Sequence, residues 1–405
     1  MAHTSQLNLA SRQFKADPYP FYAKLRAEAP VFRTILPSRQ PAWLITRYED
    51  ALAALKDERL VKDRRNALSR ERPAKPPWMP AFMRPLARNM LDLDAPDHTR
   101  LRALVHQAFT PRRIEQLRTR IQVLCDELLD AAEAQGGLEL IEAYALPIPL
   151  TIIAELLGVP AADRPAFRRW SEHVVTISSV TGLLRALPGV WRIVRYLRTL
   201  CARRRADPQD DLLTALVQAE QAGDRLSEDE LLGMVFLLLL AGHETTVNLI
   251  GNGVLTLMEH PDQRELLRQN PALIKPAVEE LARYASPVIM ATERYAREEL
   301  TIAGTTIPRG ELVFAVIASA NRDERKFAEP DRLDLMREPN HHLAFGQGIH
   351  YCLGAPLARM EMQIALTTLL RRLPELRLSR PAESLRWRPG MFVRGLEQLP
   401  MALVG

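Results

Sequence analysis

The chain has 405 residues, of which 47% are hydrophobic and 25% charged, and its 54 Lys and Arg against 49 Asp and Glu give a net charge of +5. This composition is ordinary for a soluble protein with a substantial core, and it includes no long basic run of the kind that binds nucleic acid. Cys125, Cys201 and Cys352 are too few and too widely spaced for a disulfide framework or a paired-cysteine zinc site, which predicts a cytoplasmic protein.

No membrane span is expected from the hydropathy pattern. The N-terminal segment lacks the apolar core of a signal peptide. The longest apolar run, Leu231–Gly242, is too short to cross a bilayer, which takes about 20 residues.

The N-terminal part predicts a hairpin, a short helix and a long loop. Residues 30–36 and 42–50 alternate apolar and polar side chains as strands do, and residues 50–57 resemble a short helix. Residues 61–90 combine charges, prolines and large apolar side chains, which predicts a long loop with a functional role.

The middle of the chain is predicted to be helical. From Pro96 to about Gly223 the apolar spacing is that of helices, with breaks expected at the positions of glycine pairs and prolines. These breaks are Gly136-Gly137, Pro147, Pro160 and Pro188. Residues 302–320 predict strands and turns, with a turn at 308–310. No repeat or linker is present, so we expect one mixed domain, 1–405, in which helix dominates.

One predicted helix is unusually long. Ser227 and Glu230 fit a capping box, in which each side chain bonds the other residue's backbone N–H. The pattern continues to Glu259 before Pro261, roughly 32 residues or about 48 Å. Its first half is apolar all round, which indicates a helix buried on every side.

Polar residues interrupt this helix at HETTVN, residues 243–248. Burying Glu244 without a partner would cost several kcal/mol. Either the threonines bond back to the preceding turn with Glu244 at the surface, or the polar residues have a function. His243 and Glu244 also suggest a zinc hydrolase, but position 247 of that motif requires histidine and is Val247.

Two further pairs of polar residues are spaced to share a helical face. Glu280 and Arg283 are three apart and can form an ion pair, and His98 and Arg102 are four apart. Taken alone, each pair is also typical of the solvent-exposed face of a helix and does not indicate a functional site.

The segment AFGQGIHYCLGAP, residues 344–356, places Cys352 in a glycine-rich loop. Pro356 suits a first helical turn, and Leu357, Met360 and Ile364 then predict a helix that runs toward Pro374. A thiol at a helix N-terminus is favoured as the thiolate, although most cysteines are simply small buried hydrophobic residues.

Taken in order, HTRLR, AGHETT, ELAR, ATERYA, PDRLDL and FGQGIHYCLG resemble the motifs of the cytochrome P-450 superfamily of haem-thiolate monooxygenases. The resemblance extends from about Asp17 to the C-terminus and is closest to soluble bacterial members that oxidise polyketides, macrolides, steroids or fatty acids. It implies a mainly α fold with small β-sheets (α+β), with the haem between the long central helix and the helix that follows the cysteine loop.

The resemblance implies that Cys352 is the axial thiolate of haem b, iron protoporphyrin IX. Gly354 and its neighbours would let backbone N–H groups approach the sulfur, and Phe345 would shield it. Four residues match the positions that bind the haem propionates: His98, Arg102, Arg294 and His350. The resemblance also implies a buried network of Glu280, Arg283 and Arg332. Leu333 stands where the family usually has an aromatic residue.

On the long helix, the resemblance implies that Glu244 and Thr245 deliver, through water, the protons that dioxygen cleavage needs. Ala241 and Gly242 would leave room for dioxygen. The implied reaction inserts one oxygen atom into a C–H bond or an alkene and reduces the other to water. A haem-binding sensor or carrier without turnover is the alternative, and the Glu244–Thr245 pair argues against it.

The resemblance implies external electron donors and a lipophilic substrate. A ferredoxin with its reductase would dock near the cysteine side, where Arg100, Arg112, Arg113 and Arg359 offer positive charge. Substrate contacts would come from the 61–90 loop, from residues 168–195 and from a set of apolar residues. The individual residues are Trp78, Met79, Phe82, Leu238, Ala241, Val288, Ile289, Met290, Met391 and Phe392.

Overall fold

The computed structural model describes residues 8–68, 80–87, 89–175, 180–221 and 226–403. Trp78 and Met79, which were predicted to contact the substrate, lie outside these residues.

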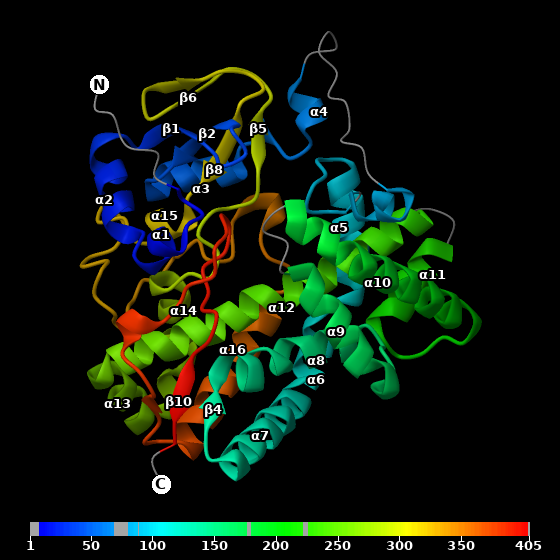
Figure 1. The fold of residues 1–405 in the computed structure, drawn as a ribbon. Coiled ribbons are helices and arrows are strands. Elements are labelled where there is room, and N and C mark those ends of the chain that lie inside the picture. The colour runs from blue at the N-terminus through cyan, green and yellow to red at the C-terminus, as the bar shows by residue number, and fades with distance from the viewer. Residues whose placement is uncertain (1–7, 69–79, 88, 176–179, 222–225, 404–405) are drawn as a thin grey trace.

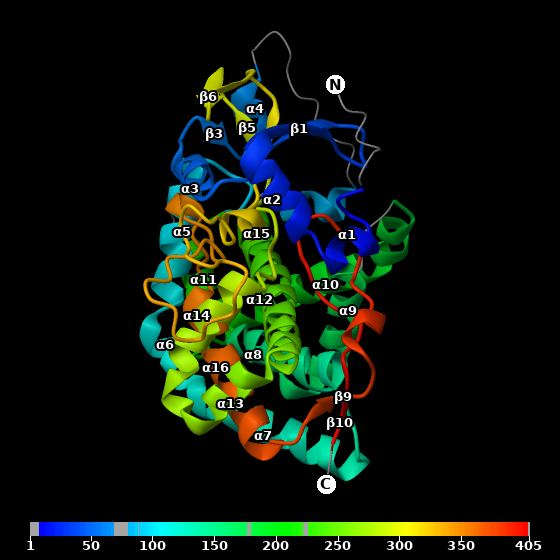
Figure 2. The ribbon, with the colours of Figure 1, turned by 90° about the vertical axis from the view of Figure 1, so that its left-hand side faces the viewer.

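A five-stranded sheet forms one end of the molecule (Figures 1 and 2). Its strands, in spatial order, are β1 (Val31–Ile35), β2 (Pro41–Ile45), β8 (Leu312–Ala315), β5 (Arg294–Ala296) and β3 (Leu60–Val61). Strands β2 and β8 are parallel, and the other neighbours are antiparallel. Arg294 pairs with Val313 of β8, so one predicted haem contact is fixed in the sheet.

Two smaller sheets complete the β structure. The first contains β4 (Leu138–Glu139), β10 (Pro400–Ala402) and β9 (Arg377–Leu378). The second pairs β6 (Leu300–Ile302) with β7 (Thr305–Ile307).

Helices make up the rest of the molecule (Figures 1 and 2). The α-helices are α1 Arg12–Ala16, α2 Tyr19–Glu28, α3 Tyr48–Lys56, α4 Arg64–Ala67, α5 Asp97–Ala108, α6 Pro111–Gln116, α7 Arg118–Gln135, α8 Pro147–Leu156, α9 Arg164–Val175, α10 Val180–Ala206, α11 Leu212–Gln221, α12 Glu228–Glu259, α13 Pro261–Gln269, α14 Ile274–Tyr284, α15 Ile317–Ala320 and α16 Ala355–Arg372. Short 3₁₀ turns are η1 Ala81–Ala87, η3 Ala161–Asp163, η4 Pro271–Leu273, η5 Gly348–His350 and η6 Ala382–Ser384, and η2 Ile141–Ala145 is a π-helix.

Helix α12 runs through the centre of the molecule in both ribbon views (Figures 1 and 2). It has the predicted length of 32 residues, and Ser227 and Glu230 form the predicted capping box. It packs against α8, α14 and α16, within the largest hydrophobic core. In the described part of the chain, α12 alone is long and apolar enough to cross a bilayer, but more than half of its apolar window is buried inside the protein, as in a core helix.

Several element predictions are confirmed. Strand β1 and helix α3 form where expected, and helix α16 begins with Pro356 in its first turn and buries Leu357, Met360 and Ile364. Helices end or begin at Gly136, Pro147 and Pro160, as predicted.

Other boundaries differ from the prediction. The second predicted strand, 42–50, ends at Ile45, because Tyr48 and Glu49 already belong to α3. The 61–90 segment contains α4 and η1 rather than loop alone, and residues 317–320 are helical. Pro188 lies inside α10, where it removes one backbone hydrogen bond without ending the helix, because packing against α9 and α11 supports it.

Candidate active site

A cavity of about 280 Å³ lies where α5, α12, β5 and the cysteine loop meet. Its wall includes all nine residues predicted to bind the cofactor: His98, Arg102, Ala241, Gly242, Arg294, Phe345, His350, Cys352 and Gly354. Thr245, Leu238 and Val288 also line it. The structure thus brings together residues from four separate parts of the sequence around one cavity.

Glycines shape the loop that carries Cys352. Gly346 and Gly348 have φ of +71° and +73°, which side chains other than glycine rarely adopt. A Cβ at Gly348 would also lie 2.7 Å from the carbonyl oxygen of Leu55. The backbone N–H of Cys352 donates to the carbonyl of Phe345 at 2.9 Å, which closes the loop. The position of the thiol is therefore fixed by backbone geometry.

The groups around Cys352 have opposing effects on the pKa of its thiol. Burial raises the pKa of the thiol, whereas the backbone N–H groups of Gly354 and Ala355 and the cations Arg102 and Arg359 lower it. N–H groups directed at sulfur are the contacts that tune a thiolate ligand. The guanidinium of Arg359 also stacks over the ring of Phe345 at 4.2 Å, so the predicted shielding residue is held in place.

Basic side chains gather at the other end of this wall. The rings of His98 and His350 lie 4.3 Å apart, Arg102 donates to the carbonyl of Tyr351 at 2.7 Å, and Arg294 donates to the carbonyl of Leu60 at 3.3 Å. Within the described residues, the two ring nitrogens of buried His98 and the Nε of buried Arg294 have no hydrogen-bond partner.

The pKa values of this basic cluster show an excess of positive charge. Burial, followed by repulsion from Lys62, His98 and Arg294, lowers the pKa of His350 to about 2. Burial and Arg294 lower the pKa of Lys62 to about 7, and burial lowers that of Arg294 to about 10. Lys62 was not predicted as a site residue; it precedes Asp63 in the segment interpreted as loop, and no sequence motif marks it.

This cavity fits haem b. A cysteine sulfur in the cavity wall, residues of α12 that line the same cavity and basic side chains with unpaired donors match an iron porphyrin with two carboxylates. Arginine suits the carboxylates because its planar fork binds them through two parallel hydrogen bonds. The residues that would hold the propionates are His98, Arg102, Arg294 and His350.

On α12, the polar segment bonds to its own backbone. The hydroxyl of Thr245 donates to the carbonyl of Ala241 at 3.0 Å, and that of Thr246 donates to Gly242 at 3.4 Å. Glu244 is half-buried rather than at the surface, and burial raises its pKa despite the nearby Arg388. The back-bonding alternative therefore holds for the threonines but not for the position of Glu244. Glu244 itself does not line the cavity.

The predicted charge network is present, with one member corrected. Glu280 and Arg283 are both 0% exposed and form a two-pronged ion pair with both distances at 2.7 Å. The third arginine is Arg337, whose Nε donates to Glu280 at 3.1 Å. Arg332 was predicted, but its side chain is 66% exposed and pairs with Glu329; only its carbonyl joins the network, by accepting from Arg283 at 3.4 Å.

Several predicted substrate contacts do not line this cavity. Ile289 and Met290 are fully buried in the core under the sheet, and Met391 packs against the same core. Phe82 packs against the main core, and the ring of Phe392 contacts Phe314. The pocket role of these five residues stays a prediction.

Other apolar residues line the cavity and were not predicted. They are Leu55, Met90, Leu91, Phe109, Pro149, Ile153, Leu237, Leu249, Pro287, Ala291 and Ile317. Helical spacing could have found Leu249, because it lies four residues after Thr245 on the same face of α12. The others are indistinguishable from core residues in a single sequence.

Most of the arginines predicted to form a docking patch are paired. Arg100 binds Glu230 at 2.6 Å, Arg113 binds Asp210 at 3.1 Å and Arg359 binds Glu279 at 2.6 Å. Arg112 is exposed and forms no ion pair with any described residue.

Comparison with known proteins agrees with this site. The Cytochrome P450 family profile matches residues 193–379. The chain is 48% identical to Cytochrome P450 107B1 of Saccharopolyspora erythraea over 96% of this chain and 95% of that protein. It is 46% identical to the Vitamin D(3) 25-hydroxylase of Pseudonocardia autotrophica over 99% and 97%. The solved structure of Bacillus subtilis PksS, a cytochrome P450 of the bacillaene polyketide synthase, superposes with a TM-score of 0.91 at 42% identity and covers 98% of this chain and 100% of that one.

The three relatives cover 96% to 99% of the chain. Other similar proteins are named as a monooxygenase, a hydroxylase/epoxidase and a hydroxylase, which favours catalysis over the sensor alternative. The protein is a haem b-containing monooxygenase that uses dioxygen, an electron donor and lipophilic substrates. The chain belongs to the cytochrome P450 family.

Proposed function

We propose that Cys352 is the proximal ligand of the haem, and that Glu244 and Thr245 supply protons to dioxygen on the opposite face. The observation that carries the proposal is one cavity wall formed by Cys352 and another formed by Ala241, Gly242 and Thr245. When bound between these walls, haem b activates dioxygen for insertion of one oxygen atom into the substrate.

The residues around Cys352 hold and tune the sulfur. The N–H groups of Gly354 and Ala355 favour the thiolate by lowering its pKa, and Arg359 adds positive charge on the same side. Phe345, held under Arg359, excludes water from the sulfur. His98, Arg102, Arg294 and His350 orient the porphyrin by binding its carboxylates.

Thr245 is placed to pass a proton into the cavity. Because its hydroxyl hydrogen bonds the carbonyl of Ala241, its oxygen lone pairs are free to accept a hydrogen bond from water. Glu244 precedes it on the same helix, and burial raises the pKa of its carboxyl, so it holds a proton more readily than an exposed glutamate does. The two residues form an acid–alcohol relay, with Glu244 as the proton source and Thr245 as the cavity contact.

The substrate is a medium-to-large lipophilic molecule. The wall above Cys352 is apolar, with Leu237, Leu238, Leu249 and Val288 facing the cavity, and its charged groups are confined to the basic cluster and Glu361. A polyketide, macrolide, steroid or fatty acid fits this lining.

The electron donor is a small acidic ferredoxin with its reductase, in the cytoplasm. Exposed Arg112 lies at the start of α6 and provides positive charge that steers such a partner. Arg113, beside it, contributes less because it is paired with Asp210. Arg100 and Arg359 contribute less because their charges are already paired.

The ligand assignment is tested by the absorption spectrum of reduced protein under carbon monoxide. Haem-loaded wild type is expected to show the red-shifted Soret band of thiolate-bound haem, and Cys352→Ser is expected to lose that shift. Cys201→Ser, which changes a cysteine buried in the core, is the control and keeps the band. A red-shifted band that survives in Cys352→Ser contradicts the assignment.

The relay is tested by measuring how much NADH oxidation yields product in a system with ferredoxin and reductase. Thr245→Ala is expected to lower this coupling about tenfold or more, since general acid catalysis contributes at least that much. Thr301→Ala makes the same change at an exposed position of β6 that does not line the cavity and is expected to retain coupling. Equal coupling in wild type and Thr245→Ala would exclude the relay.

A further inference from the structure

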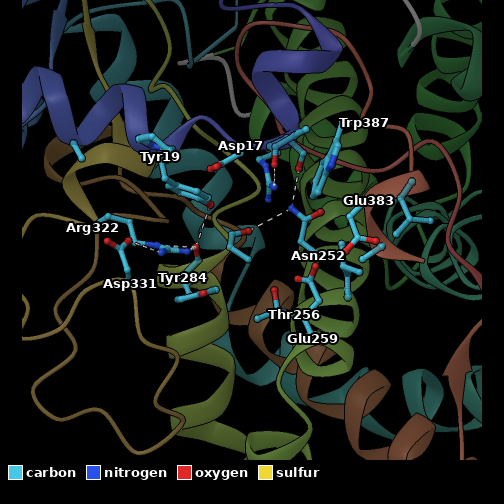
Figure 3. Close-up of a pocket in the computed structure, with 18 residues that line it drawn as sticks. Asp17, Tyr19, Asn252, Thr256, Glu259, Tyr284, Arg322, Asp331, Glu383 and Trp387 are labelled. Atoms are coloured by element: carbon cyan, nitrogen blue, oxygen red, sulfur yellow. Dashed lines mark hydrogen bonds and ion pairs between the residues drawn. The ribbon is translucent and has the colours of Figure 1, made fainter. Parts of the chain in front are cut away.

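A second cavity, of about 530 Å³, lies at the C-terminal end of α12 (Figure 3). It is bordered by the end of α14, the start of α2 and the segment 382–394. None of its lining residues lines the haem cavity, so the two sites are separate.

Three hydrogen-bond acceptors lie on the face of α12 that borders this cavity. Asn252, Thr256 and Glu259 are at positions i, i+4 and i+7, which share one helical face. In Figure 3 the carboxylate of Glu259 points toward the side-chain amide of Asn252. All three side chains therefore border the same cavity from one helix.

The amide of Asn252 presents an unused acceptor. Its Nδ2 donates to the carbonyls of Ala285 at 3.3 Å and Arg394 at 2.9 Å, and these two acceptors fix which end is nitrogen. Its Oδ1 is buried without a hydrogen-bond partner among the described residues, and the side chain is only 2% exposed. A buried acceptor without a donor costs about 1–3 kcal/mol, so this oxygen marks a place for a donor that the chain does not provide.

The carboxylates at this cavity are also available. Glu259, Glu383 and Asp17 form no ion pair with any residue in the described ranges. Burial raises the pKa of Glu259, His260 and Arg394 lower it, and Glu383 raises it further, so a cation bound beside the two carboxylates would relieve their mutual repulsion.

The two arginines in the wall are already engaged. Arg394 donates to the carbonyls of Lys15 at 2.8 Å and Ala16 at 2.9 Å, and it stacks on Trp387 at 3.5 Å. Arg322 pairs with Asp331 at 2.6 Å and stacks on Tyr284 at 3.6 Å. Among the described residues, neither arginine donates a hydrogen bond to the side chain of Asn252, Thr256 or Glu259.

We propose that this cavity binds a primary alkylammonium. An ammonium carries three N–H donors, which match Asn252 Oδ1, the Thr256 hydroxyl and the Glu259 carboxylate. Its aliphatic chain would lie against Leu255, Leu385 and Trp387, and a second ammonium on that chain would reach toward Glu383. The ligand is organic rather than a metal ion, because no group of described His, Cys, Asp or Glu residues is arranged to hold one.

Isothermal titration calorimetry of the haem-loaded protein with 1,4-diaminobutane tests this site. Saturable heat is expected with the diamine and none with 1,4-butanediol, which has the same length without charge. Glu259→Gln and Thr256→Val are each expected to weaken binding about tenfold, the value of one hydrogen bond to a charged group. Glu228→Gln, the same change at the other end of α12, leaves binding unchanged.

An amine that coordinates the iron would shift the Soret band, so absorption recorded through the same titration separates that event from binding here. The proposal is overturned if no saturable heat is found, or if Glu259→Gln binds the diamine as tightly as wild type does. Because Glu259 is exposed at the end of its helix, this variant is expected to fold normally.

Discussion

Two buried charged regions of this protein contrast in how their charges are satisfied. In the network around Glu280, every charge has partners within the chain. The carboxylate accepts from Arg283, Arg337 and Asn340 and from the backbone N–H of Asp334, while Arg283 also donates to the carbonyls of Asn321 and Pro330. In the basic cluster around His98, Arg294 and His350, burial lowers the pKa of all three side chains, and donors remain unpaired within the described residues.

This difference distinguishes buried charges that stabilise the fold from buried charges that bind a ligand. A buried charge is stable only when hydrogen bonds and opposite charge replace water. Where the chain supplies both, as at Glu280, the charges hold loops together. Where it supplies less, as at Arg294, whose Nε has no partner among the described residues, the two carboxylates of haem b are the partners that we propose.

The comparison is tested most strongly by removing a central charge of the network. Arg283→Met leaves the Glu280 carboxylate buried with its main partner gone, which is expected to lower the free energy of unfolding by about 3–5 kcal/mol. Urea denaturation followed by circular dichroism measures the change, and loss of haem content is expected with it. A loss below about 1 kcal/mol would show that this network is not a structural element.

Replacing the third arginine of the network is expected to have a smaller effect on the free energy of unfolding, and Arg332 offers a matched control. Arg337→Met removes one hydrogen bond to a buried carboxylate and is expected to cost about 1.5–3 kcal/mol. Arg332→Met alters an exposed side chain and is expected to stay within about 0.5 kcal/mol of wild type in the same denaturation experiment. The reverse order of effects would restore Arg332 to the network.

For the basic cluster we expect the opposite result: a substitution weakens haem binding without destabilising the haem-free protein. Arg294→Leu removes a partner of a haem carboxylate and is expected to speed haem transfer to excess apomyoglobin about tenfold or more. Since it also removes a buried, poorly paired charge, the haem-free protein is expected to be as stable as wild type or more stable. Exposed Arg297→Leu serves as control. Equal destabilisation of loaded and haem-free protein would place Arg294 with the structural network.

The sequence predicted the site well where the chemistry depends on spacing along one element. The cysteine loop, the His98–Arg102 pair and the capped helix α12 follow from local patterns, so their residues meet at the cavity as expected. The predicted helix that follows Cys352 and the charge pair on α14 are equally local.

Prediction failed where tertiary packing decides. Arg332 and Arg337 lie five residues apart in one irregular loop, and only the folded loop shows which side chain turns inward. Ile289 and Met290 follow the same helix as Val288 and are buried in the core under the sheet, where their backbone N–H groups donate to the carbonyl of Phe392, so their pocket role stays a prediction. The pKa of Lys62 is lowered first by burial and then by Arg294, and both depend on the folded arrangement.

Glu361 is a third case, a buried carboxyl group with no ion-pair partner among the described residues. It lies on α16, borders the haem cavity, is 1% exposed and has no ion pair or hydrogen bond among the described residues. Burial alone raises the pKa of its carboxyl well above the ordinary value. Burial therefore favours the protonated form of this acid in the folded protein.

This state makes stability depend on pH in a defined direction. Because the folded pKa of Glu361 is raised, its contribution is fully present below the unfolded pKa and declines as pH rises toward the folded value. Glu361→Gln cannot ionise, so its advantage over wild type in free energy of unfolding is expected to grow with pH, by at most about 1.4 kcal/mol per unit. Urea denaturation at pH 5, 6 and 7 measures this difference. A difference that is constant across these pH values would mean that Glu361 ionises normally in the fold, and that this charge, like Glu280, has a partner.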